Sequence, residues 1–141
     1  MFFKSYKILG TWDQQNPFKI DTERDLNAPV VIITRASIKA GHVMKFWKKV
    51  PSITMFLNTC TNNIFSIGIG EIPWFYQVTF SIWKTEEEMI AFAHKDKNHA
   101  SAAKKSMDGN WFKEYMFNGY YLTGSIGSWK GENPMEDIDF S

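Results

Sequence analysis

His99 is the residue of this chain best placed to do chemistry, because it heads a stripe of small side chains. If a helix covers residues 99–106, one helical face carries four residues at three- and four-residue spacing: His99, Ala102, Ala103 and Ser106. Small side chains beside an imidazole leave space for a flat ligand, and histidine is a common proximal ligand of haem iron. The stripe predicts that His99 ligates haem, while a surface or capping histidine stays open as the alternative.

Arg35 is the second candidate, because it ends a run of β-branched residues at positions 30–33. A cation at the end of an apolar strand needs a carboxylate of the protein, a negative ligand group such as a haem propionate, or solvent at the sheet edge. A salt bridge is the commoner case. Contact with a cofactor carboxylate is the functional hypothesis for Arg35.

Other reactive residues fall in patterns that exclude common enzyme classes. Glu71 has no partner acid or base for proton transfer. His42 and His94 lack the small-residue stripe, and Cys60 with dispersed histidines gives no zinc-ligand spacing. No phosphate-binding glycine loop, dinucleotide-binding pattern or Ser/His/Asp arrangement is present. These observations argue against hydrolase, kinase and dehydrogenase functions.

The composition predicts one domain spanning residues 1–141. The 16 basic and 15 acidic residues give no electrostatic footprint for nucleic acid. No apolar stretch reaches the roughly 20 residues that cross a bilayer, and the N-terminus lacks a signal-peptide pattern. The single cysteine is typical of a reducing compartment, so we expect a cytoplasmic protein without a transmembrane segment.

The order of predicted elements indicates an α+β fold. Apolar alternation predicts strands at residues 2–9, from residue 30 to Arg35, on both sides of Pro73, and at residues 116–123. Helical spacing predicts a helix between Gly41 and Cys60 that is interrupted at Pro51, a helix opened by a capping box at Thr85, and another near residues 99–107. This order matches the ferredoxin-like split βαβ arrangement. We expect an N-terminal strand and loop (1–29), a core (30–123) and a tail (124–141).

Two further patterns bear on assembly. In residues 65–70 the small residues Ser66, Gly68 and Gly70 alternate with larger apolar ones, so one strand face leaves room for a ligand. Helices would cover only one sheet face, and an apolar second face would be buried by another copy, giving a dimeric α+β barrel. We therefore expect a homodimer. The chain also ends much as it begins, with GTWDQQNPF at residues 10–18 and GSWKGENPM at residues 127–135.

Several long segments resemble the C-terminal half of the spheroidene monooxygenase family of acyclic carotenoid 2-ketolases. They are TRASIKAGHVMKFWKKVPSI (34–53), FSIGIGEIPWFYQVTFSIW (65–83), AFAHKDKNH (91–99), NWFKEYMF (110–117) and GSWKGENPM (127–135). Members of that family are about twice as long, with two related α+β halves. The resemblance implies that residues 1–18 correspond to the end of the first half, and that two short chains could pair to imitate the tandem halves.

The resemblance also implies a function in carotenoid biosynthesis. It is that of a haem-dependent monooxygenase that uses oxygen and a reductant on an apolar small-molecule substrate. His99 would then be the catalytic iron ligand, Arg35 would anchor a negative group of the cofactor, and Trp47 and Trp111 would line the substrate pocket. Ordinary core packing is the alternative for both tryptophans.

Two other functions remain open. Cofactor-independent oxygenation is known in other dimeric α+β barrels. A non-catalytic protein that binds an apolar ligand or haem would fit the absence of convergent polar groups. Transient contact with a membrane is compatible with each function.

Overall fold

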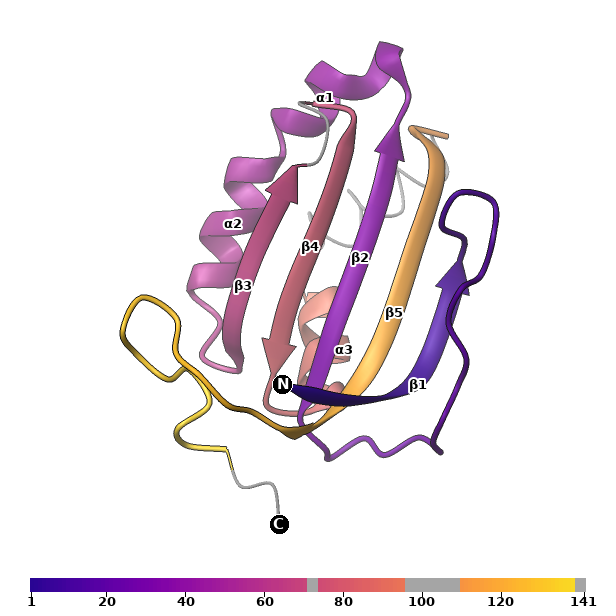
Figure 1. Ribbon diagram of the computed structural model, residues 1–141. Coiled ribbons are helices and arrows are strands. Elements are labelled where there is room, and N and C mark those ends of the chain that lie inside the picture. Colours follow the sequence, from indigo (N-terminus) through magenta and orange to yellow (C-terminus); the bar gives the residue numbers. More distant parts are fainter. Residues whose placement is uncertain (71–73, 96–109, 139–141) are drawn as a thin grey trace.

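Five strands form one antiparallel sheet in the computed structural model, which describes residues 1–70, 74–95 and 110–138. The strands are β1 (Phe2–Gly10), β2 (Val30–Ile38), β3 (Asn63–Gly70), β4 (Tyr76–Trp83) and β5 (Phe112–Gly124). The helices are the 3-10 turn η1 (Ala40–His42), α1 (Val43–Trp47), α2 (Val50–Asn58) and α3 (Glu86–Lys95). Figure 1 views the sheet from the side opposite α3.

The strand order confirms the predicted ferredoxin-like arrangement. The sheet runs β1-β5-β2-β4-β3, so the first and third core strands, β2 and β4, lie at its centre. This is the order expected of a split βαβ unit. β1 is the added N-terminal strand, and it pairs antiparallel with β5.

The helix starts agree with their sequence signals. Pro51 lies in the first turn of α2, where its missing N–H removes no helical hydrogen bond. The Thr85 hydroxyl accepts a hydrogen bond from the Glu88 amide at 3.2 Å, which caps α3 as the sequence predicted. Three glutamates in the first turn of α3 complement the positive end of the helix dipole.

A cluster of aromatic and aliphatic side chains forms the core between the sheet and the helices. β2 contributes Val30 and Ile32, and α3 contributes Met89 and Phe92. Tyr6 stacks on Tyr121 with ring centroids 4.3 Å apart, and the same ring lies directly over Gly119. Burial raises the pKa of the Tyr6 hydroxyl well above its ordinary value, with nearby Glu86 as a second cause.

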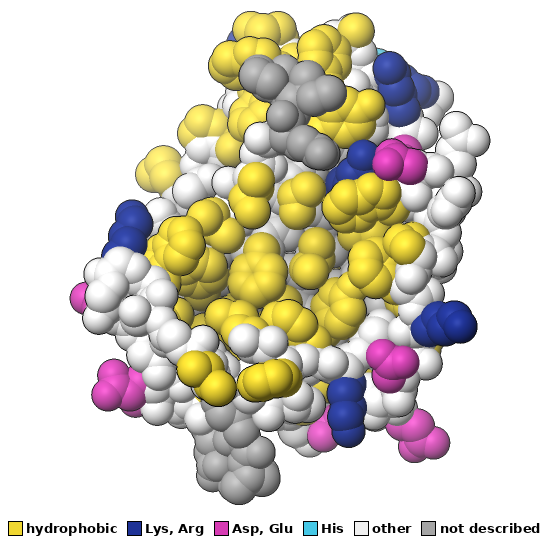
Figure 2. Space-filling view, in the orientation of Figure 1, with side chains coloured by type: hydrophobic (Ala, Val, Ile, Leu, Met, Phe, Trp, Pro, Cys, Tyr) yellow, Lys and Arg dark blue, Asp and Glu magenta, His cyan; other side chains and the backbone are white. Residues whose placement is uncertain are grey.

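The opposite sheet face, here called the open face, carries a second set of apolar residues. β2 directs Val31 and Ile33 to it, and their neighbours across the sheet include Ile82 and Tyr120. Figure 2 shows a continuous apolar area over the middle of this face, with charged side chains around its rim. The register places Phe65, Ile67 and Ile69 of β3 on the open face, so Ser66, Gly68 and Gly70 face the helix-bearing side.

The similar end segments have the same local structure. The N-terminal arm (residues 10–18) and the C-terminal arm (residues 127–135) each form a tight turn, closed by paired backbone hydrogen bonds between Trp12 and Gln15 and between Trp129 and Glu132. In each arm, the two central turn residues have positive φ angles. The arms then insert Phe18 and Met135, respectively, into the open-face cluster.

Strand ends differ from the sequence predictions by more than two residues in two places. β2 continues to Ile38, so Arg35 lies inside the strand and does not end it. β5 begins at Phe112, four residues before the predicted start at Met116. Cross-strand pairing between Ser37 and Glu114 extends both strands through polar positions with weak β propensity. Glu71 and the helix predicted near residues 99–107 lie outside the described residues.

Candidate functional site

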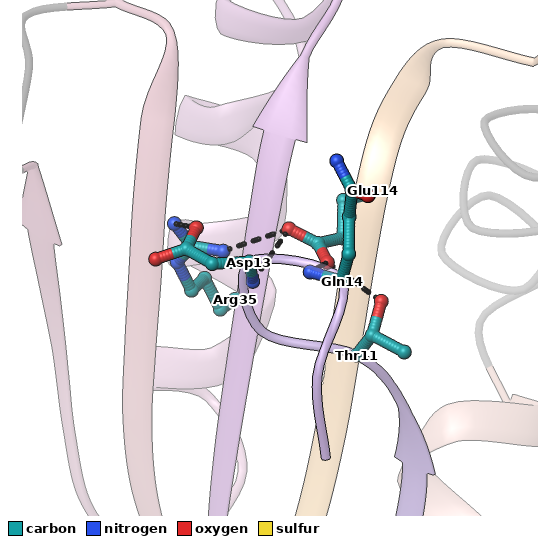
Figure 3. Close-up of polar contacts among 5 residues, drawn as sticks. All are labelled: Thr11, Asp13, Gln14, Arg35 and Glu114. Carbon is teal, nitrogen blue, oxygen red and sulfur yellow. Dashed lines mark hydrogen bonds and ion pairs between the residues drawn. The ribbon is translucent and has the colours of Figure 1, made fainter. Parts of the chain in front are cut away.

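Arg35 is the centre of a charged cluster on the open face (Figure 3). Its side chain is only 4% exposed. One terminal nitrogen lies 3.1 Å from Asp13 Oδ1, and the other lies 3.2 Å from Glu114 Oε2. Asp13 comes from the N-terminal arm and Glu114 from β5, so the cluster joins segments that are far apart in sequence.

Two aromatic rings enclose the same guanidinium group. Its central carbon lies 4.5 Å from the centroid of the Trp12 ring and 5.3 Å from that of Tyr76. Cation–π contacts of this kind offset part of the cost of removing a cation from water. Nε is the only nitrogen of Arg35 without a hydrogen-bond partner among the described residues.

Glu114 is held in its ionised form by several donors. Its carboxylate accepts hydrogen bonds from the Thr11 hydroxyl at 2.6 Å and from the backbone amides of Gln14 and Asp13. These contacts lower the pKa of Glu114, with the Thr11 hydrogen bond as the largest cause and Arg35 as a smaller one. The cluster therefore fastens the N-terminal arm to the sheet, as the salt-bridge alternative for Arg35 predicted.

Trp47 and Trp111 lie in an aromatic cluster near the end of β2. Phe46 contacts Trp47 and Phe112 at centroid distances of 5.6 and 6.0 Å. The Trp47 indole N–H donates to the Trp74 carbonyl at 2.9 Å, while its ring meets the Trp74 ring edge-on at 5.6 Å. Because its polar N–H is satisfied, Trp47 can present an apolar surface.

Trp111 is flanked by two basic side chains. The His42 ring stacks on it with centroids 5.7 Å apart and planes at 10°. The Lys49 ammonium lies 5.3 Å from its centroid. Both tryptophans are half-buried. Each therefore packs against neighbouring side chains, which was the alternative to a pocket role, and also keeps part of its ring accessible.

Trp47 and Trp111 thus each pack against other rings, and Phe46 links Trp47 to Phe112, the sequence neighbour of Trp111, while Arg35 lies in a charged cluster. His99 and its stripe lie outside the described residues, so their roles stay predictions. Sequence reasoning missed Trp12, Asp13 and Glu114 as partners of Arg35. The repeated Gly-Thr/Ser-Trp pattern indicated that the arm has a defined structure, but it did not predict that Arg35 binds the arm.

Residues 1–70, 74–95 and 110–138 contain no group of three or more His, Cys, Asp or Glu side chains arranged to hold a metal ion. His94 is exposed on α3. None of the helices within these ranges is long and apolar enough to cross a membrane.

Three curated proteins match most of this chain, each a spheroidene monooxygenase. The protein from Rhodobacter capsulatus is 42% identical over 128 residues, which cover 89% of this chain and 53% of the relative. The protein from Cereibacter sphaeroides is 35% identical over 140 residues, covering 94% of this chain and 43% of the relative. The protein from Rubrivivax gelatinosus is 30% identical, covering 91% and 48%. This chain spans about half the length of these relatives.

Solved structures support the fold. The cofactor-independent oxygenase SnoaB from Streptomyces nogalater, an N63A mutant, superposes with a TM-score of 0.56 at 9% identity, covering 72% of this chain and 99% of SnoaB. A Streptomyces coelicolor monooxygenase solved with nanaomycin D gives a TM-score of 0.51 at 9% identity, covering 74% and 96%. No family model matches the chain. The three curated relatives confirm the resemblance to the spheroidene monooxygenases over about nine-tenths of this chain.

Proposed function

We propose that this chain takes part in the monooxygenation of a long apolar substrate of the acyclic carotenoid class. The observation that carries the proposal is the 42% identity to a spheroidene monooxygenase over 128 residues. In such a reaction one atom of dioxygen enters a substrate C–H bond, while two electrons and two protons from a reductant convert the other atom to water. The protein's task is to bind the polyene, orient the reacting carbon and exclude water.

The two tryptophans offer surfaces suited to that task. Trp47 and Trp111 are half-buried, and the Trp47 N–H is already bonded to a carbonyl. Because its N–H is bonded, Trp47 can meet a hydrocarbon chain without losing a hydrogen bond to water, whereas Trp111 offers the part of its ring that His42 and Lys49 leave uncovered. We assign both tryptophans to substrate contact.

Haem with His99 as its ligand remains the proposed source of oxygen activation. When bound, haem would supply the redox chemistry, and the chain would supply orientation. The Arg35 guanidinium is already bound by Asp13 and Glu114, and its Nε, which has no partner among the described residues, is buried, so Arg35 offers a propionate no accessible donor in this structure. His42 stacks on Trp111 and its buried Nδ1 makes no hydrogen bond among the described residues, but we keep His99 as the ligand candidate because it heads the small-residue stripe and stands in a segment that resembles the family.

We also propose that two chains pair through the open face. That face carries a continuous apolar area, and Ile69 on it is 52% exposed. Burial of such an area against a second copy is favourable at roughly 25 cal/mol per Å² of apolar surface. Exposed apolar patches of this kind mark interfaces more often than free surface.

The function is tested by incubating the purified protein with an acyclic carotenoid, dioxygen and a reductant, and analysing the extract by mass spectrometry. We expect an oxygenated product, and a raised KM in Trp47→Leu and Trp111→Leu. Tyr115→Leu, which removes an exposed aromatic ring from β5, serves as the control and should leave KM unchanged. No product under any reducing condition contradicts the proposal.

Haem dependence has a separate test. Addition of the wild-type protein or of His94→Ala should shift the Soret band of haemin, whereas addition of His99→Ala should not. Turnover without any Soret shift would favour cofactor-independent oxygenation. A carotenoid that co-purifies with the protein but is never converted would favour the carrier function.

A further inference from the structure

The two arms carry opposite charges at the same position of the same turn. Asp13 follows Trp12 in the N-terminal arm, and Lys130 follows Trp129 in the C-terminal arm. The φ angles of these two residues are 50° and 54°, so the two backbones point their side chains in corresponding ways. In both arms an Asn side chain then accepts a hydrogen bond from the amide two residues later, at Phe18 and Met135.

The arms border the open face on opposite sides. The N-terminal arm lies over the β5 side, where Trp12 and Asp13 contact Arg35. The C-terminal arm lies over the β3 side, where Trp129 meets Phe65 edge-on at 5.5 Å. Figure 1 shows the two loops flanking the sheet, with the apolar area of Figure 2 between them.

Both charges are accessible. The Asp13 side chain is 73% exposed, although one of its oxygens binds Arg35. Lys130 is exposed and makes no ion pair within the described part of the chain. A shallow, open hollow beside Asp13 is lined by residues of the N-terminal arm alone.

We infer that the open face takes a second copy of this chain, with the N-terminal arm of each copy against the C-terminal arm of the other. The two copies would be related by a two-fold axis that lies in the plane of the interface and runs oblique to the strands. Such an axis places the N-terminal arm of one copy over the C-terminal arm of the other, because the arms border opposite sides of the same face. Asp13 of one copy then meets Lys130 of the other, and the same contact occurs twice. The apolar faces supply the attraction, and the two ion pairs at the rim set the orientation.

This contact rests on the pairing proposed above and adds its docking mode. Without it, two apolar sheet faces can meet at several relative rotations, since hydrophobic burial is not directional. Reciprocal charges at the rim favour the rotation that joins unlike arms. Any rotation that joins like arms brings Asp13 against Asp13, or Lys130 against Lys130, which is repulsive.

Sedimentation of the full chain tests the inference through charge reversal. Lys130→Glu should raise the dimer dissociation constant roughly tenfold at low salt, because two rim attractions become repulsions. Asp13→Asn keeps an oxygen that can accept a hydrogen bond from Arg35. It should weaken the dimer when made alone, but strengthen it when added to Lys130→Glu, where it removes the repulsion between Asp13 and the new glutamate. Lys48→Glu makes the same charge change on an exposed site between α1 and α2 and should have no effect.

The outcomes separate the docking mode from the pairing. A wild-type chain that stays monomeric at all concentrations overturns the pairing itself. A dimer that responds equally to Lys130→Glu and Lys48→Glu overturns only the arm contact. Weakening by Lys130→Glu that Asp13→Asn does not partly reverse also overturns it.

Discussion

Arg35 illustrates how a buried cation is stabilised on an otherwise apolar sheet. Two carboxylates neutralise it, and two aromatic rings cover its faces. The sequence indicated that Arg35 needed a negative partner, because it follows a β-branched run. It could not name Asp13 and Glu114, since these contacts depend on the path of the N-terminal arm and on the exact strand register.

Replacing Arg35 should destabilise the fold measurably. Arg35→Met keeps much of the apolar stem but leaves the largely buried Glu114 without its cation, and we expect a loss of about 2 kcal/mol in the free energy of unfolding. Urea denaturation measures the change. The double variant Arg35→Met with Glu114→Gln should lose less than the sum of the single variants, whereas strict additivity would show that the two side chains are not coupled.

Glu114 should also give the protein part of its acid sensitivity. Its pKa is lowered in the folded state from an ordinary value of 4.5. The resulting stabilisation is present above that ordinary value and is lost as the pH falls through the lower folded-state pKa. Glu114→Gln should therefore flatten the dependence of unfolding free energy on pH below about 4.5.

The control for this pH effect lies on the other arm. Glu132→Gln removes an exposed carboxylate from the C-terminal arm, and we expect the acid sensitivity of this variant to match that of the wild type. Equal pH profiles for Glu114→Gln and the wild type would contradict the role assigned to the Thr11 and backbone hydrogen bonds.

At the scale of elements, the strongest local signals gave correct predictions. The capping box at Thr85 and the proline at position 51 both mark helix starts in the structure. The predicted start of the last strand, Met116, was wrong because Lys113 and Glu114 have weak strand propensity, and only pairing with β2 extends β5 back to Phe112. Element types were thus readable from local sequence, but this boundary depended on a distant strand.

The α3 cap can be tested by a conservative pair of substitutions. Thr85→Ala removes the hydroxyl that accepts the Glu88 amide, and it should lower the unfolding free energy by about 1 kcal/mol. Thr85→Ser keeps the hydroxyl and should lose much less. If both variants lose the same amount in thermal or urea unfolding, the hydroxyl is not the capping group.

Gly119 should be far less tolerant of a methyl group than Gly68. A Cβ at Gly119 would lie 2.6 Å from the Tyr6 ring. A Cβ at Gly68 would have Gln77 Nε2 as its nearest neighbour, at 3.9 Å. Overpacking of a buried strand costs about 1–3 kcal/mol, so Gly119→Ala should be clearly destabilising. Gly68→Ala should change the unfolding free energy little, and an equal loss in both variants would contradict the packing described for Tyr6.

At the scale of the whole molecule, the repeated end segments are the feature that sequence similarity and structure explain together. Their shared Trp, Asn and Pro residues predicted a relationship between the two ends. The structure adds that the arms share one turn and flank one apolar face. Sequence alone could not place them there, because the position of each arm depends on where its preceding strand lies in the sheet.

Insertion of oxygen from dioxygen into an apolar polyene is the activity that we propose for this protein. The most direct measurement uses isotopically labelled dioxygen, an acyclic carotenoid and a reductant, with any ketone reduced at once to prevent exchange with water. We expect an alcohol that carries one labelled oxygen atom per reaction. Recovery of unchanged carotenoid, or of a product whose oxygen comes from water, would contradict it.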